Sequence, residues 1–452
     1  TKPQNAAYFQ YEQYWGKAPV LTYYDSLGRK LRTVSYVYGD KTVFRDWKYS
    51  SKGLLEKVSK AYFSTDSPAY LEYEYDDTGR KIAEHYPDGS IKTWNYQSLG
   101  LEGEVITETN RLGQKTTRYN NFRGQTYKCV DNLGGAIEYG YDTDGNCTSI
   151  TGPNSSISME FDEFGNRVYM NDSDCGSYSF EYDGFGQQTS QIHEDSGRGF
   201  PTEYDALGRI TRREDSDGIT DYVYSSDRLG LLESVSNEDT GVSMSYRYDN
   251  NNNPTQEAIT VNGTTYRTYY THDNKNNLTR IHYPNHFDVI NEYDDYGHLT
   301  SVKHPSKSIT YWQLMDADEQ NRPLRYKLGN GIVAKREYDK NTGALTSLSD
   351  STLFKYIYKY DFEGNLTSQR KDSIFLTYYE YDGLNRLIDY TQRVLFERPG
   401  GRPGDEIYPM FPRSTANAIP DNYIGPNPLL IPKTQYDKAG NITKIGYIDT
   451  GM

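Results

Sequence analysis

The chain has 452 residues and a formal charge of −14, with 63 Asp and Glu residues against 49 Lys and Arg residues. This charge argues against sequence-independent nucleic-acid binding, which needs a basic face to neutralise phosphates. No run of about 18 apolar residues occurs, so we expect no transmembrane segment. Apolar residues make up only 35% of the chain, yet aromatic residues reach 14% and Tyr alone contributes 46 residues. Because disordered chains are poor in aromatic residues, this composition favours a folded β protein without an aliphatic core.

A short element, Tyr-Asp-x-x-Gly followed by Arg or Asn, recurs along almost the whole chain. Its clearest copies are Tyr24-Asp25 with Gly28, Tyr75-Asp76 with Gly79, Tyr141-Asp142 with Gly145, Tyr204-Asp205 with Gly208, Tyr360-Asp361 with Gly364, and Tyr436-Asp437 with Gly440. Degenerate copies start at Tyr49, Tyr96, Tyr119, Phe161, Tyr182, Tyr224, Tyr248, His272, Tyr293, Met315, Tyr338 and Tyr381. Successive starts lie 20 to 26 residues apart until the last gap of 55 residues. A fixed period of this length is the signature of a repeat architecture.

Each copy predicts two strands joined by a tight turn. Polar and aromatic residues alternate before the motif, as in Tyr356 to Tyr360, which is the period of a strand. The motif Asp is expected to cap the turn by accepting hydrogen bonds from the amides ahead of it. The motif Gly is expected at a positive φ, where a Cβ would clash. These side chains, at the 18 positions of the six clear copies, are therefore predicted to be structural residues.

The repeats together predict one long sheet, because a single hairpin cannot bury a face alone. Eighteen units of two strands give about 36 strands, and at ~4.8 Å per strand the ribbon is roughly 170 Å long. Such a twisted ribbon is expected to curl. We expect Tyr rings to stack between adjacent strands, with their hydroxyls left free for partners or water. The predicted fold class is all-β, with tandem hairpins in one curled sheet, which is a hollow spiral shell if the curl closes.

These motifs resemble the YD-repeat, or Rhs, family, which includes polymorphic toxin shells, shell components of insecticidal toxin complexes and teneurin-like adhesion proteins. The resemblance runs from Tyr23 to Ile445. It implies a β-ribbon that spirals into a shell around a C-terminal toxic domain, or that supports adhesion surfaces. Many family shells end in an Asp-Pro-x-Gly region that cleaves the cargo free, and no such tetrapeptide occurs here. The chain therefore resembles an excised repeat region, or a shell whose cargo lies outside it.

One segment breaks the period. Residues 397–432 hold eight of the 18 prolines, including Pro399 and Pro403 in a Gly-rich stretch that cannot continue a strand ladder. The predicted organisation is a β-shell of seventeen repeats at 1–396, a Pro-rich insertion at 397–432, and a final repeat at 433–452. The insertion is either a plug that packs on the shell or a surface loop.

Other candidate chemistry is better explained by the repeat. Five histidines, His272, His282, His286, His298 and His304, lie close in sequence, but their turn context explains this recurrence without a metal. Asp142 to Asn146 resembles the start of a calcium loop, yet the later Glu ligand is missing. Cys129, Cys147 and Cys175 occupy different phases of their repeats. We therefore predict no catalytic residue, no metal and no cofactor.

The sequence thus predicts a non-enzymatic, secreted or cell-surface shell whose partner is an enclosed effector or toxin polypeptide. The alternative is an adhesion module that binds a cell-surface glycan or another cell's protein through exposed aromatic residues. A hydrolase that uses a pair of carboxylates is the third and weakest hypothesis.

Overall fold

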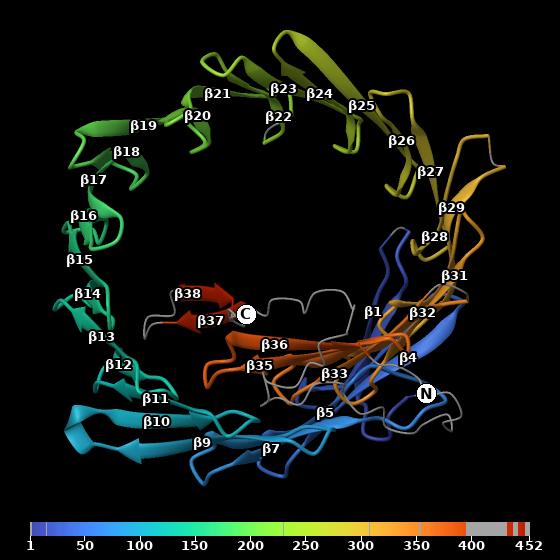
Figure 1. The fold of residues 1–452 in the computed structure, drawn as a ribbon, viewed down its shortest axis with the longest axis horizontal. Coiled ribbons are helices and arrows are strands. Elements are labelled where there is room, and N and C mark those ends of the chain that lie inside the picture. Colours follow the sequence, from blue (N-terminus) through green and yellow to red (C-terminus); the bar gives the residue numbers. More distant parts are fainter. Residues whose placement is uncertain are drawn as a thin grey trace, which may run out of the picture. The chain divides into compact units, whose positions relative to one another are not determined.

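The computed structural model describes residues 2–14, 16–228, 230–306, 308–351, 354–394, 432–436 and 442–447 (Figure 1). These residues form 38 strands and one short 3-10 helix, η1 (Gly100–Glu102). Thirty-six of the strands belong to one sheet, and the last two form a separate hairpin. The predicted all-β fold of tandem hairpins is therefore confirmed. Within the described residues, no helix has the length and hydropathy needed to cross a bilayer.

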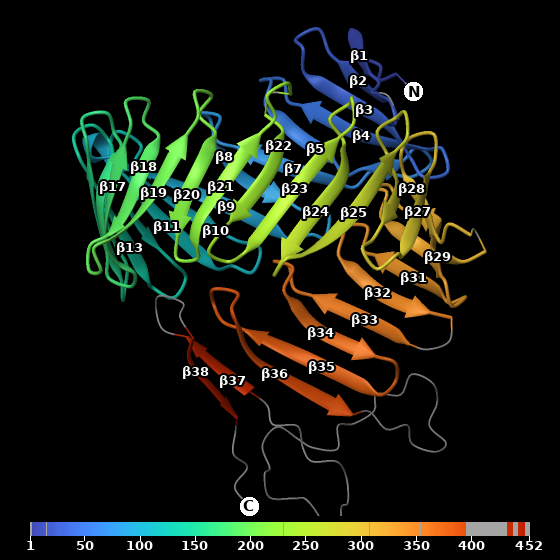
Figure 2. The same ribbon diagram turned by 90° about the horizontal axis from the view of Figure 1, so that it is seen from above.

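The strands follow one another along the chain, and sequential neighbours pair antiparallel at almost every step (Figure 2). The first nineteen are β1 (Tyr8–Glu12), β2 (Val20–Tyr24), β3 (Lys30–Val37), β4 (Lys41–Tyr49), β5 (Leu55–Ser59), β6 (Tyr62–Phe63), β7 (Tyr70–Tyr75), β8 (Lys81–His85), β9 (Ile91–Ser98), β10 (Glu104–Thr109), β11 (Lys115–Asn120), β12 (Thr126–Val130), β13 (Ala136–Tyr141), β14 (Cys147–Thr151), β15 (Ser156–Phe161), β16 (Arg167–Asp172), β17 (Gly176–Tyr182), β18 (Gln188–His193) and β19 (Arg198–Tyr204). The others are β20 (Ile210–Asp215), β21 (Gly218–Tyr224), β22 (Leu232–Asn237), β23 (Val242–Tyr248), β24 (Pro254–Val261), β25 (Thr264–His272), β26 (Leu278–His282), β27 (Asp288–Tyr293), β28 (Leu299–Lys303), β29 (Thr310–Ala317), β30 (Pro323–Leu328), β31 (Val333–Tyr338), β32 (Leu345–Asp350), β33 (Lys355–Tyr360), β34 (Leu366–Lys371), β35 (Phe375–Tyr381), β36 (Leu387–Val394), β37 (Pro432–Tyr436) and β38 (Ile442–Tyr447).

The chain divides into two compact units. Unit 1 comprises the described residues of Thr1–Tyr11, Val20–Ala136 and Met315–Met452, and unit 2 comprises those of Glu12–Pro19 and Ile137–Leu314. The predicted insertion at 397–432 lies, apart from its last residue, outside the described residues. The described part of the final repeat is the β37–β38 hairpin.

The motif turn between β19 and β20 shows why the sequence forms hairpins. The Asp205 amide donates to the Arg209 carbonyl, and the Gly208 amide donates to the Asp205 carbonyl, both at 2.9 Å. Gly208 has a φ of 78°, and the strand register shifts at Tyr204. This is a tight turn closed by a Gly bulge, in which only a residue without a Cβ sits at low cost. The shift recurs at the motif Tyr of other copies, including Tyr24, Tyr75, Tyr141, Tyr360 and Tyr436.

Three degenerate copies were predicted in the wrong register. The turn assigned to Tyr96 is built on Leu99, whose amide donates to the Gly103 carbonyl. The turn assigned to Tyr119 is built on Asn121, whose amide donates to the Gln125 carbonyl. The turn assigned to Met315 is built on Asp318, whose amide donates to the Arg322 carbonyl. In all three, the residue in the Tyr position is small or polar (Ser98, Asn120 or Ala317), so the nearest large side chain gave the wrong start.

The apolar core is small, as the composition requires. One buried cluster in unit 1 is formed by Val34, Phe44 and Tyr62. Beside it, Arg32 pairs with Asp46 through two bonds of 2.6 and 2.7 Å, and the Tyr62 hydroxyl donates to the same carboxylate at 2.6 Å. Burial of Tyr62 and its bond to Asp46 raise the pKa of this phenol. Paired polar groups thus contribute to the stability of the core where aliphatic side chains are scarce.

Substitution of Gly208 by Val should lower the free energy of unfolding by about 1–3 kcal/mol, because a β-branched residue at positive φ is strained. An added Cβ would also lie 2.6 Å from Gln187 Nε2. Gly184→Ala is the matched control, since Gly184 is exposed and an added Cβ meets nothing within 4 Å. Chemical denaturation of both variants tests this prediction. Equal midpoints for Gly208→Val and the unsubstituted protein would contradict the turn geometry.

Candidate functional site

The motif Asp organises each turn through both carboxylate oxygens. In the Asp205 copy, Oδ1 accepts from the amides of Leu207 and Arg209 at 2.9 and 3.0 Å, while Oδ2 accepts from Arg209 Nε at 2.7 Å. Asp25 makes the same three contacts with Leu27 and Arg29. Asp76 makes them with Thr78 and Arg80. Where the motif ends in Asn, the amide Nδ2 replaces the guanidinium, as in Asp142 with Asn146 and Asp361 with Asn365.

In several copies this arrangement lowers the pKa of the motif carboxylate. The Arg209 side chain and then its backbone amide hold the pKa of Asp205 below its usual range. The Thr78 hydroxyl lowers the pKa of Asp76 first, followed by the contacts from Arg80. At Asp142, the Asn146 side chain lowers the pKa most. Hydrogen bonds to the charged form cause these shifts, because they favour the carboxylate over the acid.

The remaining motif residues lie where the turn needs them. The motif glycines all have positive φ, namely Gly28 (78°), Gly79 (85°), Gly145 (100°), Gly208 (78°) and Gly364 (91°). Asp437 and Gly440 of the last copy lie outside the described residues. Tyr24 stacks on Tyr8 with ring centroids 5.1 Å apart. Tyr141 is half-buried, and burial raises its pKa.

The hydroxyl of the motif Tyr joins each repeat to the one before it. Tyr204 donates to the carbonyl of Gln188 at 2.8 Å, and Gln188 is the first residue of the second strand in the preceding repeat. The same bond, at 2.8 to 3.0 Å, links Tyr75 to Leu55, Tyr96 to Lys81, Tyr182 to Arg167, Tyr248 to Leu232, Tyr293 to Leu278, Tyr360 to Leu345, Tyr381 to Leu366, and Tyr436 to Leu387. We call this series the hydroxyl ladder.

The motif Arg joins each repeat to the one after it. The Arg209 guanidinium lies 4.2 Å from the ring centroid of Tyr224, the first motif residue of the next repeat. The other cation–π contacts of this kind are Arg29 over Tyr49, Arg80 over Tyr96, Arg322 over Tyr338 and Arg386 over Tyr436. Such contacts contribute about 0.5–1 kcal/mol at exposed sites.

The expectation of stacked Tyr rings with free hydroxyls is therefore wrong for most motif tyrosines. Their hydroxyls are bound to backbone carbonyls, and where the motif ends in Arg the guanidinium covers the next ring. The register shift at the motif Tyr explains the difference, because it aims the hydroxyl at the neighbouring repeat rather than along the strand. The phenol must keep its proton to act as a donor. Burial of Tyr248 raises its pKa, which favours this protonated form.

In unit 1, two runs of repeats meet along the ends of their strands, and we call this contact the edge seam. Motif turns of β30–β36 meet the opposite turns of β3–β12. Asn321 accepts from the Tyr38 amide at 3.0 Å, and Asp316 pairs with Lys41 at 2.7 Å. The other contacts are Lys340 with Asp66 at 3.6 Å, Glu363 with the Arg111 amide at 2.9 Å, and Asn385 with Gln114 at 3.2 Å.

Most of the seam residues are polar. It encloses a cavity of about 220 Å³, which is lined by Lys92, Glu108, Asn110, Gln114, Thr116, Asn132, Glu363, Gly383, Leu384 and Asn385. Burial lowers the pKa of Lys60, which lies near Asp339 and Gly343. The two runs of unit 1 are thus joined by charge pairs and amide contacts.

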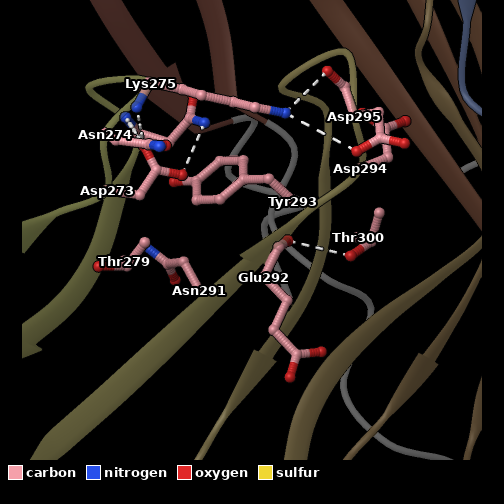
Figure 3. A pocket seen from close by; sticks show the side chains of 11 residues that line it. Asp273, Asn274, Lys275, Thr279, Asn291, Glu292, Tyr293, Asp294, Asp295 and Thr300 are labelled. Carbon is pink, nitrogen blue, oxygen red and sulfur yellow. Dashed lines mark hydrogen bonds and ion pairs between the residues drawn. The ribbon is translucent and has the colours of Figure 1, made fainter. Parts of the chain in front are cut away.

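Unit 2 holds a second hollow of about 450 Å³ between the turns at 273–277 and 294–297 (Figure 3). Lys275 Nζ reaches the Asp295 carbonyl at 3.3 Å, and the Tyr293 hydroxyl donates to the Leu278 carbonyl at 2.9 Å. Asp273 accepts from Asn277 Nδ2 at 3.0 Å. The polar groups of this hollow thus belong to the repeat's own hydrogen bonding.

The histidines that the sequence placed close together do not converge on one point. His282 Nδ1 lies 2.7 Å from Asp288, His298 Nδ1 lies 2.9 Å from Asp294, and His304 Nδ1 contacts Ser306. In the described part of the chain, no group of three His, Cys, Asp or Glu side chains could hold a metal ion. Asp142, at the calcium-like stretch, accepts from the amides of Asp144, Gly145 and Asn146 instead.

Stability should fall as the pH drops below about 4, the usual pKa of Asp in an unfolded chain. A carboxylate with a lowered folded pKa adds stability above the unfolded pKa and loses it as the pH falls through the folded value. Asp205→Asn removes this titration but keeps an acceptor, as Asn110 and Asn121 do in their turns. Its Tm should fall less steeply between pH 5 and pH 3 than that of the unsubstituted protein. An unchanged slope, with exposed Asp77→Asn as control, would contradict the assignment.

Loss of one hydroxyl of the ladder should destabilise the sheet measurably. Tyr204→Phe leaves the Gln188 carbonyl without its donor, so the free energy of unfolding should fall by about 1 kcal/mol. Tyr266→Phe, at a tyrosine that is 52% exposed, serves as the matched control. Denaturation midpoints provide the measurement. A larger loss in the control than in Tyr204→Phe would remove the ladder as a stabilising element.

Comparison with known proteins gives two curated relatives, both WapA nucleases of Bacillus species, and several solved structures. No family profile matches the chain. The tRNA nuclease WapA of Bacillus subtilis is 24% identical over 264 residues, which cover 50% of this chain and 11% of that protein. The chain therefore spans only a small part of this relative.

The solved structures match over nearly the whole chain. The TcdB2-TccC3 structure without its hypervariable C-terminal region matches 96% of this chain, with a TM-score of 0.75 and 15% identity. The Tc holotoxin pore of Photorhabdus luminescens matches 95%, with a TM-score of 0.74 and 16% identity. These matches cover 26% and 25% of the respective chains. At such identities they establish the fold. Together with the Tyr-Asp-x-x-Gly series, this fold confirms the resemblance of the chain to the YD-repeat, or Rhs, shell proteins.

Proposed function

We propose that the chain forms part of the wall of a YD-repeat shell that encloses a polypeptide effector. The observation that carries this proposal is the edge seam of unit 1, where motif turns of one run bind the opposite turns of another through Asn321, Lys340, Glu363 and Asn385. Contacts between strand ends of this kind support a ribbon that could close on itself. Closure is the property that confinement requires.

The burial of the strands supports a wall rather than a packed core. In β9 and β15, exposed residues alternate with half-buried ones, and neither strand contains a buried residue. A sheet inside a globular domain would bury one face against a second layer. Both faces of these strands therefore meet solvent, as expected for a partition between two aqueous spaces.

The proposal assigns confinement, and no catalysis, to the repeat residues. The motif carboxylates of Asp25, Asp76 and Asp205 are ionised and bound to turn amides and guanidinium groups, so they are poorly placed to act as general acids. The relatives are consistent with a toxin context, because one is called a tRNA nuclease and the solved structures belong to a Tc toxin. The enclosed effector, and export to the cell surface or medium, are parts of this proposal.

Protease protection in the natural gene product tests the proposal. Any polypeptide that the wall encloses should resist digestion while the seam is intact. Reversing two seam charges, in Lys41→Glu with Arg111→Glu, should expose it and raise its rate of digestion at least tenfold, because these residues face Asp316 and Glu363. Lys41→Arg with Arg111→Lys retains the charges and serves as the control.

Two results would count against confinement. Equal digestion of the enclosed segment in the two double variants would show that the seam does not protect it. Specific binding to immobilised glycans, with no protected segment, would favour the alternative of an adhesion module.

A further inference from the structure

Three consecutive motif turns of unit 2 carry a large apolar side chain at the same place, directly before the motif Gly. These are Phe164, Phe185 and Leu207, which are 82%, 93% and 61% exposed. They lie at the hairpins β15–β16, β17–β18 and β19–β20, which follow one another in the sheet. Two strands separate each from the next, so their spacing is about 10 Å. We call these residues the tip row.

The turn geometry presents these side chains rigidly. The amides of Phe164, Phe185 and Leu207 each donate to the motif carboxylate of their own turn at 2.9 Å. The tips therefore need no water to satisfy their backbone donors, so transfer into a less polar medium leaves none of these three groups unpaired. Their neighbours Gly184 and Ala206 add no charge at two of the three tips.

In three other motif turns, the residue directly before the motif Gly position contacts another part of the chain. Leu384, which precedes the turn residue Asn385, is half-buried at the edge seam of unit 1 beside Gln114. Glu363 and Lys275 fill the position with polar groups that bond to Arg111 and Asp295. The tip row differs from these, because its apolar groups protrude into solvent. Exposed apolar groups that recur in phase indicate a binding surface.

We propose that the tip row inserts into the interface of a zwitterionic lipid bilayer. The three separated side chains of the tip row bury at most about 600 Å². This area is below the roughly 800 Å² per partner of a stable protein interface. A fluid lipid interface requires no minimum contact area, because each side chain of the tip row inserts by itself. Aromatic residues also favour the headgroup region. The net charge of −14 disfavours anionic lipids and so points to zwitterionic headgroups. This inference goes beyond the proposed shell and does not depend on an enclosed effector.

Co-sedimentation with phosphatidylcholine vesicles tests the inference on the full chain. The triple variant Phe164→Ser, Phe185→Ser, Leu207→Ser should lower the partition coefficient at least tenfold, because each buried apolar side chain contributes about a factor of ten. The control is Ile137→Ser, Val223→Ser, Val261→Ser, which changes three exposed apolar side chains of unit 2 outside the tip row and should bind as the unsubstituted protein does. Vesicles with added phosphatidylserine should bind less at low salt.

A fluorescence readout locates the contact. Phe185→Trp, at the most exposed tip, should show a blue-shifted emission with vesicles and quenching by brominated acyl chains. Absence of vesicle binding, or binding that the triple Ser variant leaves unchanged, would overturn the inference. So would concentration-dependent self-association that the triple variant abolishes without lipid, since the tip row would then bind a second copy.

Discussion

The hydroxyl of the motif Tyr binds the first carbonyl in the second strand of the preceding repeat, and the other features of the wall depend on this bond. A hairpin alone is marginal in water, and this chain lacks the aliphatic residues that usually compensate. Tyr supplies a large ring for packing and a donor for the neighbour. The motif Arg extends the link forward, as Arg209 does over Tyr224. A repeat that makes both contacts is thus held on both sides, and stability accumulates by nearest neighbours.

Hydrogen bonds within a turn and contacts across the edge seam both fix where the strand ends lie. The first act between neighbouring residues, and the second between distant repeats. Inside a turn, Asp205 uses both carboxylate oxygens locally, which fixes where the next side chain projects. Because the turns project regularly, groups on distant repeats meet in pairs, such as Lys41 with Asp316. The seam is polar, so the strand ends remain compatible with water on both sides. A wall of one layer can exist only under this condition, since it has no interior of its own.

Much of the fold could be predicted from the sequence because its determinants are local. The motif turn and the positive φ of Gly208 follow from residues within five positions of one another, and the period of 20 to 26 residues repeats this turn along the chain. The partner of the Tyr204 hydroxyl lies 16 residues earlier and depends on the register shift, so ring stacking was the wrong inference. The seam joins residues up to 283 positions apart, and no local pattern marks them. Asn121 and Asp318 show the same limit, because their turns form without a motif Tyr.

Because distant repeats pair across the edge seam, the number of residues between two partners determines which turns meet. Removal of one whole repeat between Arg111 and Glu363 would leave most bonds between neighbouring repeats possible, since most repeats offer the same carbonyl and a Tyr ring. The 252 residues between these partners would shorten by one period, and Arg111 would face a turn from the following repeat. Repeat number is therefore free to vary in evolution only together with the charges at the strand ends. Such a chain can gain or lose length only in whole repeats, and the pairs between strand ends determine which repeat numbers are compatible with the seam.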